Sequence, residues 1–557
     1  MCGIYGYIGQ KDAFDVVLEG LGLLQYRGYD SCGIAYFDNG FKVTKAVGTL
    51  DNLKHPAVNS RLAFGHTRWA TNGQVNVTNA HPHYSVNHEY TLVHNGIINN
   101  AEQLKSELEA KGIKFYSQTD TEVIANLVYT LPGDIEEKLK ACVKLLDGSY
   151  SLIIGDKDKN LYLLKKFSPL NFVKAADGIY ISSDKSSLPS GELYTLKDGD
   201  IIKINENTIE FIQGRLEFVK HENDIKQLSK GKYPHYMIKE IMETPRALKN
   251  TYNSICQTDF AKVFEQYKKI TFIGCGTAYH SCLVGEYLFK QLSRFDTEHF
   301  LASNYLTNKK ISKKHLHIIV SQSGETADCI KVAEQIKKQK GKILLITNEE
   351  KSSLANLVDI VICTHANKEI AVASTKTYCC QLFVFEYIYH KLKDKNYNLN
   401  IDEFATKIEK YINKTDVSDL VDIYKTENKM IMIGKNFDYL VLKEASLKIR
   451  EIDYFYTIPM YAGELKHGTL SLVDENTDVI ALDTQNSQEI QTAISEIKSR
   501  KGRVINMQKY LPKDIFQLDY KAIYAIIPFQ LLSYNLALKL GINPDMPKNL
   551  AKSVTVE

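Results

Sequence analysis

The spacing of hydrophobic residues changes near residue 220 of this 557-residue chain. Before that point, short segments rich in β-branched and aromatic residues alternate with turn residues, which is typical of strands. Two stretches with helical spacing interrupt them. We therefore predict an α+β domain with packed antiparallel sheets over residues 2–218. Its expected strands include residues 33–37, 90–94, 150–154 and 161–164, and its expected helices are 101–111 and 121–129.

Beyond residue 240, apolar strands alternate with long amphipathic helices, which predicts parallel sheets with helices on both faces. The pattern runs twice in outline, so we predict two similar α/β subdomains at 240–395 and 405–540. A polar linker at 219–239 precedes them, and a polar tail at 541–557 follows. The expected strands are residues 270–273, 316–320 and 342–347, then 431–434, 479–482, 504–506 and 522–527.

Composition narrows the functional classes. The 69 Lys and Arg residues nearly balance 66 Asp and Glu residues, so we expect neither a nucleic-acid nor a membrane partner. No apolar run approaches the ~18 residues of a membrane span, and the start of the chain lacks a signal-peptide pattern, so a cytoplasmic protein is expected. The ten cysteines form no CxxC pair and should be reduced. Neither a metal cluster nor a cofactor motif appears.

Cys2 is the first candidate for chemistry. If Met1 is removed, one residue carries a thiol and a free α-amine, and that amine, with a reference pKa of about 8, can serve as the base for the thiol. The alternative is a cysteine that stands second by chance, and position alone does not decide between the two.

A second candidate is the loop from Ser321 to Thr326, between an expected strand and an expected helix. Its hydroxyls and the helix N-terminus suit a phosphate monoester. Helix capping by the same hydroxyls is the alternative. The stretch Gly274-Cys275-Gly276-Thr277 lacks the third glycine of a dinucleotide fingerprint, so a dinucleotide is not expected.

Motifs lie along the whole chain, apart from residues 170–230. In the first region they are Cys2-Gly3-Ile4-Tyr5-Gly6, Tyr26-Arg27-Gly28-Tyr29-Asp30-Ser31, His66-Thr67-Arg68-Trp69-Ala70-Thr71, His94-Asn95-Gly96-Ile97-Ile98 and Thr119-Asp120-Thr121-Glu122. In the second region they are the Ser321 loop, Val372-Ala373-Ser374-Thr375-Lys376, Ala462-Gly463-Glu464-Leu465-Lys466-His467-Gly468 and Leu550-Ala551-Lys552-Ser553-Val554-Thr555-Val556-Glu557. Together these motifs resemble the isomerising glutamine:fructose-6-phosphate amidotransferase family. The resemblance implies a glutaminase domain of the N-terminal-nucleophile fold, with stacked antiparallel sheets between helices, followed by two sugar isomerase subdomains.

The resemblance implies that Cys2 attacks the glutamine amide, while the Asn95 side chain and the Gly96 backbone N–H form the oxyanion hole. Arg68 would bind the α-carboxylate and Asp120 the α-ammonium. Without the resemblance, Asn95-Gly96 fits a hairpin turn and Asp120 a helix cap. The full set of implied glutamine-binding residues is Arg27, Arg68, Trp69, Thr71 and Asp120.

In the isomerase region, the resemblance implies that Glu451 moves a proton between C1 and C2 of the sugar, while Lys448 stabilises the charge that develops. His467 would open the sugar ring, and Lys552 would form a Schiff base at C2. A Lys/Glu pair at this helical spacing is otherwise an ordinary surface pair. The implied phosphate-binding residues are Ser321, Gln322, Ser323 and Thr326, and the implied sugar-site residues are Thr277, Val372, Ser374 and Ala551.

The implied reaction converts D-fructose 6-phosphate and L-glutamine to D-glucosamine 6-phosphate and L-glutamate, the first step of UDP-N-acetylglucosamine synthesis. Ammonia would travel inside the protein past Trp69, the only tryptophan of the chain, acting as a gate. A homodimer or higher homo-oligomer is expected, with His280 reaching a neighbouring subunit. The alternatives are a regulatory sugar-phosphate-binding protein and an amidotransferase or deglycase for another sugar phosphate. Ala278 and Asn72 depart from the family pattern, and Ala278 removes one expected phosphate contact.

Overall fold

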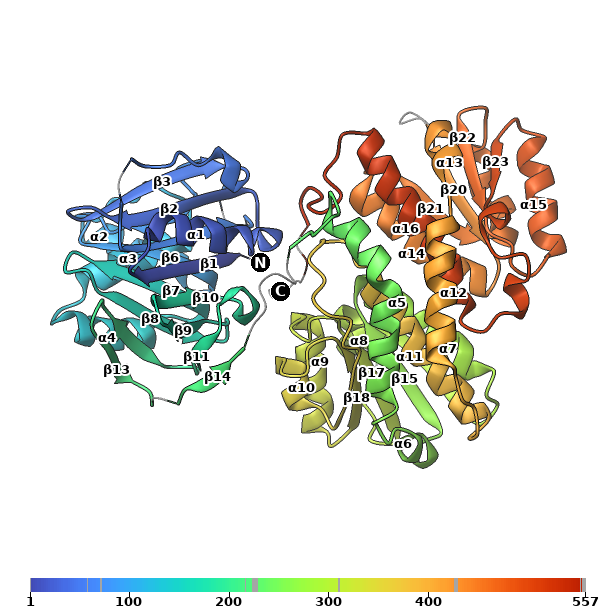
Figure 1. The fold of residues 1–557 in the computed structure, drawn as a ribbon, viewed down its shortest axis with the longest axis horizontal. Helices are drawn as coiled ribbons and strands as arrows, with labels where there is room; N and C mark the ends of the chain where they lie inside the picture. Colours follow the sequence, from blue (N-terminus) through green and yellow to red (C-terminus); the bar gives the residue numbers. More distant parts are fainter. Residues whose placement is uncertain are drawn as a thin grey trace. The chain divides into compact units, whose positions relative to one another are not determined.

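The computed structural model describes residues 2–57, 59–70, 73–215, 217–222, 229–308, 311–424, 429–550 and 552. The chain forms two compact units, which are separated in the sequence between Ser229 and Lys230 (Figure 1). This boundary lies in the stretch predicted as a linker. The same stretch also contains a short strand and the first residues of a long helix.

The first unit contains an eight-stranded and a six-stranded sheet, and every strand pair within them is antiparallel. The larger sheet has the order β14 (Val219–His221), β11 (Gly191–Thr195), β9 (Asn171–Ala175), β10 (Gly178–Ser182), β1 (Gly3–Gly9), β4 (Leu62–Arg68), β2 (Ser31–Phe37) and β3 (Phe41–Val47). The smaller sheet has the order β13 (Ile209–Gln213), β12 (Ile201–Ile204), β8 (Leu161–Lys166), β7 (Gly148–Asp156), β6 (Tyr90–Ile98) and β5 (His83–Tyr84). The helices are α1 (Ala13–Gly22), α2 (Ala101–Ala110), α3 (Asp120–Thr130) and α4 (Ile135–Leu145).

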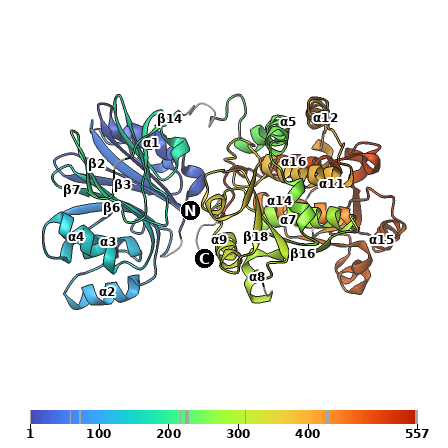
Figure 2. The same cartoon turned by 90° about the horizontal axis from the view of Figure 1, so that it is seen from below.

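Alternating side chains on the strands explain how these sheets stack. Ile4 and Ile8 of β1 belong to a core between the two sheets, whereas Tyr5 and Tyr7 of the same strand belong to a core beneath α1. A third core joins the outer face of the smaller sheet to α2, α3 and α4. Figure 2 shows these three helices gathered on one side of β6. The first unit is therefore a stack of helix, sheet, sheet and helices, as predicted.

The second unit contains two parallel sheets. The first has the order β16 (Asp296–Leu301), β15 (Lys269–Gly274), β17 (His315–Val320), β18 (Lys342–Thr347) and β19 (Ile360–Cys363). The second has the order β21 (Thr457–Tyr461), β20 (Lys429–Gly434), β22 (Thr477–Ala481) and β23 (Arg503–Asn506). In each sheet the strand order begins with the second strand, then the first, third and fourth, which supports the predicted repeat of one α/β pattern.

Helices cover both faces of these sheets, because the β-strands are apolar on both sides. In the first sheet, Phe272 and Ile318 face one core while Ile273 and Ile319 face another. The helices are α5 (Tyr236–Ile255), α6 (Ala261–Gln266), α7 (Gly276–Lys290), α8 (Ala302–Asn308), α9 (Ala327–Lys338), α10 (Ser353–Leu357), α11 (Lys376–Lys393), α12 (Ile401–Lys414), α13 (Ser418–Ile423), α14 (Phe437–Ile452), α15 (Gln488–Lys498) and α16 (Lys521–Lys539).

One predicted strand is wrong. Residues 522–527 lie in the 19-residue helix α16, whose residues are buried on nearly every side. A continuous apolar run has no period that separates a buried strand from a buried helix, so the pattern alone could not decide. The other expected strands and helices are confirmed, with ends that differ by a few residues.

Two further observations bear on the expectations from composition. Within the part of the chain that the structure describes, no helix combines the length and the apolar character needed to cross a membrane. All ten cysteines are free thiols, as predicted.

Candidate active sites

Cys2 lies directly before β1, the strand paired with β4 in the larger sheet. Because the two strands are antiparallel, with Gly3 opposite Thr67, the beginning of β1 lies beside the end of β4. Arg68 ends β4 and is only 4% exposed. The topology of the sheet therefore places the candidate nucleophile beside the arginine predicted to bind the glutamine carboxylate.

The surroundings of Cys2 hold its thiol and its backbone in place. The backbone N–H of Trp69 donates to Cys2 Sγ at 3.3 Å, and Asn95 Nδ2 donates to the Cys2 carbonyl at 3.0 Å. Burial raises the pKa of the Cys2 thiol, and the Trp69 amide and the Arg68 charge only partly offset this rise. Cys2 therefore needs a base to become a nucleophile at neutral pH.

Asn95 and Gly96 do not form a turn, so the hairpin alternative is wrong. Both lie inside β6, where Asn95 is opposite Ser151 and Gly96 is opposite Tyr150 of β7. Gly96 has a φ of +138°, and a Cβ added there would lie 1.9 Å from the Ser149 carbonyl oxygen. Only glycine fits this position. Of the two residues, Asn95 contacts the backbone of Cys2 through its side chain.

Asp120 begins α3, and its carboxylate points to the neighbouring strand. Asp120 Oδ2 accepts a hydrogen bond from the Ile98 N–H at 3.0 Å, and Oδ1 is 3.7 Å from His94 Nδ1. Burial alone would raise the pKa of Asp120, but His94 and the Ile98 amide hold that pKa below its ordinary value. The side chain thus contacts β6 and is charged at neutral pH, as an ammonium-binding group must be.

Of the remaining predicted glutamine-binding residues, the structure describes Arg27 and Trp69 but not Thr71. The guanidinium of Arg27 pairs with Asp184 at 3.1 Å, so it already has a partner inside the unit. Trp69 is half-buried, next to Arg68. Thr71 and Asn72 lie outside the described residues.

Four buried histidines lie together in this unit, and the sequence analysis gave none of them a role. The rings of His66 and His81 lie 4.1 Å apart between centroids, and His66 Nε2 is 3.0 Å from the His94 carbonyl. His83 lies beside His81, at 4.9 Å between centroids. Burial lowers the pKa of His66 to about 3, so its ring is neutral at pH 7. The available signals were the motifs that begin with His66 and His94 and the close spacing of His81 and His83 in the sequence.

In the second unit, the Ser321 loop follows β17 at the edge where β15 also ends. Ser321 Oγ accepts from the Gly324 N–H at 3.2 Å and lies 2.9 Å from Thr326 Oγ1, and Ser323 Oγ accepts from the Glu325 N–H at 3.1 Å. Thr326 precedes α9 but makes no side-chain capping bond. These hydroxyls therefore fold the loop rather than cap the helix, so simple capping does not explain them.

The same loop is attached to the next strand. The Asn348 N–H donates to the Gln322 carbonyl at 3.0 Å, directly after β18 ends. Because β15, β17 and β18 are parallel neighbours, their carboxyl ends meet at one edge of the sheet. This is where α/β sheets commonly bind ligands.

Lys448 of α14 is buried among carboxylates. Its Nζ lies 2.6 Å from Glu451 Oε2 and 3.3 Å from Glu444 Oε1, and it donates to Thr277 Oγ1 at 3.1 Å. Burial alone would lower the pKa of Lys448, but Glu444 and Glu451 raise it above its ordinary value. With 1% of Lys448 exposed, the surface-pair alternative is wrong. The predicted pair and Thr277 lie together, as one site requires.

Glu444 was missed by the sequence reasoning although it connects this group. Its carboxylate accepts from Thr277 Oγ1 at 3.0 Å and lies 2.7 Å from His280 Nδ1, and it is fully buried. His280 therefore contacts Glu444 of its own chain. The available signal was the four-residue spacing between Glu444 and Lys448, which places both on one face of a helix.

Lys552 lies against a second buried carboxylate. Its Nζ is 2.5 Å from Glu369 Oε2, and Glu369 also accepts from Ser374 Oγ at 2.9 Å and from Thr377 Oγ1 at 2.6 Å. Burial would raise the pKa of Glu369, but Lys552, the Thr377 hydroxyl and the Thr375 amide lower it to about 2. The Val372 N–H donates to the Asp545 carbonyl at 3.0 Å, which joins the same loop to the tail.

One predicted residue is not brought to these groups. His467 lies in a short 3₁₀ helix, Ala462–His467, and is exposed, and no contact within the described part of the chain joins it to Lys448. Ala551 lies outside the described residues, as do residues 553–557.

Two protein families match different parts of the chain. The family described as SIS domain matches residues 264–391 and 423–535, and the family described as glutamine amidotransferase domain matches residues 66–190. The first family covers the two parallel sheets, and the second covers much of the stacked antiparallel sheets. Together they confirm the predicted fold class, a glutaminase domain of the N-terminal-nucleophile type followed by two sugar isomerase subdomains.

Relatives match over the full length. The chain is 37% identical over 610 aligned positions to glutamine–fructose-6-phosphate aminotransferase (isomerizing) of Caldanaerobacter subterraneus subsp. tengcongensis, and 35% identical to that of Clostridium acetobutylicum, with all of each protein covered. The solved C-terminal domain of glucosamine-fructose-6-phosphate aminotransferase from Francisella tularensis covers 57% of this chain and 100% of its own, at 28% identity and a TM-score of 0.50. The chain therefore belongs to the family of isomerizing glutamine–fructose-6-phosphate aminotransferases.

Proposed function

We propose that this protein transfers the amide nitrogen of L-glutamine to D-fructose 6-phosphate, giving D-glucosamine 6-phosphate and L-glutamate. One observation carries the proposal above all. A single chain holds Cys2 beside Asn95 in its first unit, and in its second unit a buried Lys448 that contacts the partly exposed Glu451 and Thr277. These are the residues that the two half-reactions need.

In the first half-reaction, removal of Met1 gives Cys2 a free amine that takes the thiol proton. The thiolate attacks the glutamine amide, and the Asn95 amide and the Gly96 N–H stabilise the oxyanion. Loss of one such donor usually costs ~10²–10³ in rate. Asn95 Nδ2 now donates to the Cys2 carbonyl, so this donor turns toward the substrate when glutamine binds. Ammonia leaves, and water releases glutamate from the thioester.

Glutamine would be held at its other end by two charges. Arg68 offers a guanidinium to the α-carboxylate, which is a planar bidentate partner. Asp120, whose pKa is lowered, offers a carboxylate to the α-ammonium. Arg27 supports this site indirectly, because its guanidinium is already paired with Asp184.

In the second half-reaction, Lys552 gives its proton to a neighbouring base and attacks C2 of the ketose, which loses water to form a Schiff base. Ammonia adds at C2, and Lys552 leaves as the free amine. Glu451 then removes a proton from C1 and returns it to C2, which yields the aldose. The charge on Lys448 stabilises the intermediate. Ser321, Gln322, Ser323 and Thr326 bind the phosphate.

Several finer points belong to the proposal. His467 opens the sugar ring, Val372, Ser374 and Ala551 line the sugar site, and Thr71 contacts glutamine. Trp69 gates the passage of ammonia, which must stay unprotonated to remain nucleophilic. We also propose a cytoplasmic location and a homodimer or higher homo-oligomer. The family relationship does not favour a regulatory protein or an enzyme for another sugar phosphate.

The direct test is incubation of the protein with glutamine and fructose 6-phosphate, with glutamate and glucosamine 6-phosphate measured together. We expect equal amounts of the two products. The matched control replaces fructose 6-phosphate with glucose 6-phosphate, which lacks the ketone that Lys552 attacks. Release of glutamate without any aminosugar would contradict the proposal and indicate another acceptor.

A further inference from the structure

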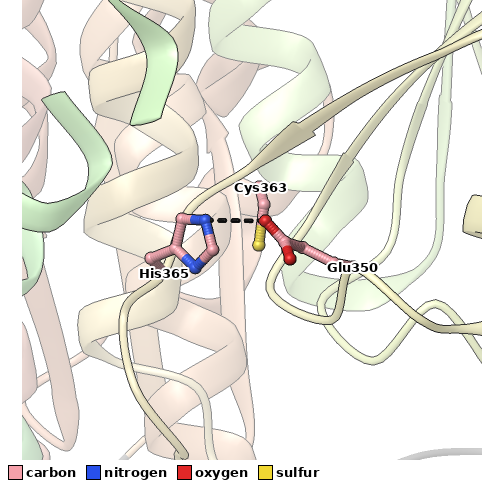
Figure 3. A group of neighbouring side chains, drawn as sticks. All are labelled: Glu350, Cys363 and His365. Carbon is pink, nitrogen blue, oxygen red and sulfur yellow. Dashed lines mark ion pairs between the residues drawn. The ribbon is translucent and has the colours of Figure 1, made fainter. Parts of the chain in front are cut away.

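Three side chains of metal-binding type converge at the carboxyl edge of β18 and β19. One ligand atom each from Glu350, Cys363 and His365 lies within 4.8 Å of the other two. His365 Nε2 is 2.9 Å from Glu350 Oε1 (Figure 3). Figure 3 shows the Cys363 sulfur beside this pair rather than turned away from it. None of the three has a role in the proposed reaction.

The topology of the sheet explains the convergence. β18 and β19 are parallel neighbours, with Thr347 opposite Cys363. Glu350 follows the end of β18, Cys363 ends β19, and His365 comes two residues later. The sequence predicted no metal site because the three ligands come from two separate loops and match no standard spacing.

The chemistry of the donors selects one class of ion. A thiolate, an imidazole and a carboxylate are together a typical zinc ligand set, whereas magnesium and calcium prefer oxygen ligands alone. Three protein ligands leave one position open. We propose that Glu350, Cys363 and His365 bind a zinc-class divalent cation, with water at the fourth position.

The spacing of one ligand pair is close to what such a site needs, and all three ligand atoms lie within 4.8 Å of one another. Tetrahedral zinc with usual bond lengths holds its ligand atoms roughly 3.3–3.6 Å apart. The pair of Glu350 and His365, at 2.9 Å, needs to open by only a few tenths of an ångström. The side chains of Glu350 and His365 are about half exposed, at 57% and 46%, so the ion can enter from solvent.

Hydrogen bonds hold the two ligand loops together. The Asn348 side chain accepts from the Ala366 N–H at 2.7 Å and donates to the Asn367 carbonyl at 2.9 Å, which ties one ligand loop to the other.

The proposed metal site is joined by hydrogen bonds to the loop of the proposed sugar-phosphate site. Asn348 donates to the Gln322 carbonyl, and the Leu354 N–H donates to the Gly324 carbonyl at 3.1 Å. Glu369, the partner of Lys552, follows on the same loop as His365. If the proposed function holds, occupancy of the metal site changes the KM for fructose 6-phosphate but leaves glutamine hydrolysis unaltered.

The test measures metal binding directly and does not depend on activity. The full chain carrying Cys2→Ala is used, so that the N-terminal thiol binds no metal. We expect close to one equivalent of zinc after dialysis, and a thiolate-to-cobalt absorption band when Co²⁺ is added instead.

Variants then assign the ligands. His365→Asn and Glu350→Gln, both at half-exposed positions, should weaken Co²⁺ binding at least about tenfold, the loss that even outer-shell partners cause. Cys363→Ser should abolish the absorption band. Cys256→Ser, which changes an exposed thiol elsewhere in the second unit, should leave both readouts unaltered. Binding of zinc or cobalt that is unchanged in His365→Asn and Glu350→Gln, or no binding in the parent protein, would overturn the proposal.

Discussion

Single buried charges in this protein depend on their immediate neighbours. Lys448 keeps its positive charge in a buried position because Glu444 and Glu451 lie within 3.3 Å of it. Glu444 in turn contacts Thr277 and His280. One carboxylate that touches no proposed reacting atom therefore holds the lysine of the proposed sugar site.

Replacing Glu444 tests this positioning role. We expect Glu444→Gln to reduce aminosugar formation at least about tenfold, which corresponds to about 1.4 kcal/mol of lost transition-state stabilisation. The pH profile of kcat should also shift, because Lys448 loses a neighbour that raises its pKa. Glutamine hydrolysis should stay the same. Glu409→Gln, on the exposed side of α12, is the matched control. A profile that does not move would mean that Glu444 is merely structural.

Gly96 gives a second prediction at this scale. An alanine Cβ would lie 1.9 Å from the Ser149 carbonyl oxygen at a φ of +138°. Strain and overpacking together should cost about 3 kcal/mol or more in the free energy of unfolding. Gly22→Ala, where the new Cβ meets open space, is the control for glycine replacement. Denaturant unfolding of both variants checks this, and equal midpoints would contradict it.

Motifs in the sequence predicted candidate residues but not the partners that those residues contact. Cys2, Arg68 and Asp120 were predicted because each lies in a motif, and the structure places Cys2 beside the end of β4, where Arg68 lies. Glu369 and Glu444 were missed, because the sequence does not reveal which carboxylate a buried lysine contacts. His467 was expected near the sugar, yet it is exposed.

At the scale of elements, periodicity identified most strands and helices, since a sheet or helix with one polar face has a readable period. It failed for α16, which is buried on nearly every side. Periodicity also gave no sign that α5 begins inside the predicted linker. The buried residues of α5, including Met237 and Glu240, pack against the core of the second unit, which only the folded chain shows.

Glu240 of α5 joins this helix to the loop before α11. Its Oε1 accepts from the Ile370 N–H at 2.5 Å and the Ala371 N–H at 3.3 Å. Burial raises the pKa of Glu240 to about 8, and the charge of Glu369 adds to that rise. Because the folded pKa lies above the unfolded value of about 4.3, the stabilising effect of the proton is complete at low pH and is lost as pH rises toward 8.

We therefore expect Glu240→Gln to reduce the loss of stability of the second unit between about pH 4.3 and 8. The neutral amide keeps an oxygen for the Ile370 and Ala371 amides but releases no proton. Hydrogen exchange of peptides from α5, measured at pH 5 and pH 8, provides the readout. Glu334→Gln, at an exposed position of α9, is the control. If Glu240→Gln and the parent protein lose protection equally, the expectation fails.

At the scale of the whole molecule, the two units should respond differently to acid. The first unit contains His66, His81 and His83, whose pKa values burial holds well below the ordinary value, with that of His66 at about 3. Neutral rings stabilise this unit above about pH 6.5, and that stability is lost as pH falls through 6.5 toward 3.

The fluorescence of Trp69 can follow this loss, because the only tryptophan of the chain lies in the first unit. We expect the denaturant midpoint of this signal to fall between pH 6.5 and pH 4. The variant His55→Gln, which changes an exposed histidine of the same unit, should follow the parent protein. A midpoint that does not change with pH would contradict the neutral-histidine interpretation.

The central claim is that each unit carries a separate site, one for glutamine hydrolysis and one for sugar isomerisation, and that the proposed reaction combines the two. The variant Cys2→Ala tests it most directly, with two rates measured on one preparation. We predict that hydrolysis of glutamine is abolished while fructose 6-phosphate is still isomerised to glucose 6-phosphate at the parental rate. Loss of both activities in a folded variant, or continued glutamine hydrolysis, would contradict the account.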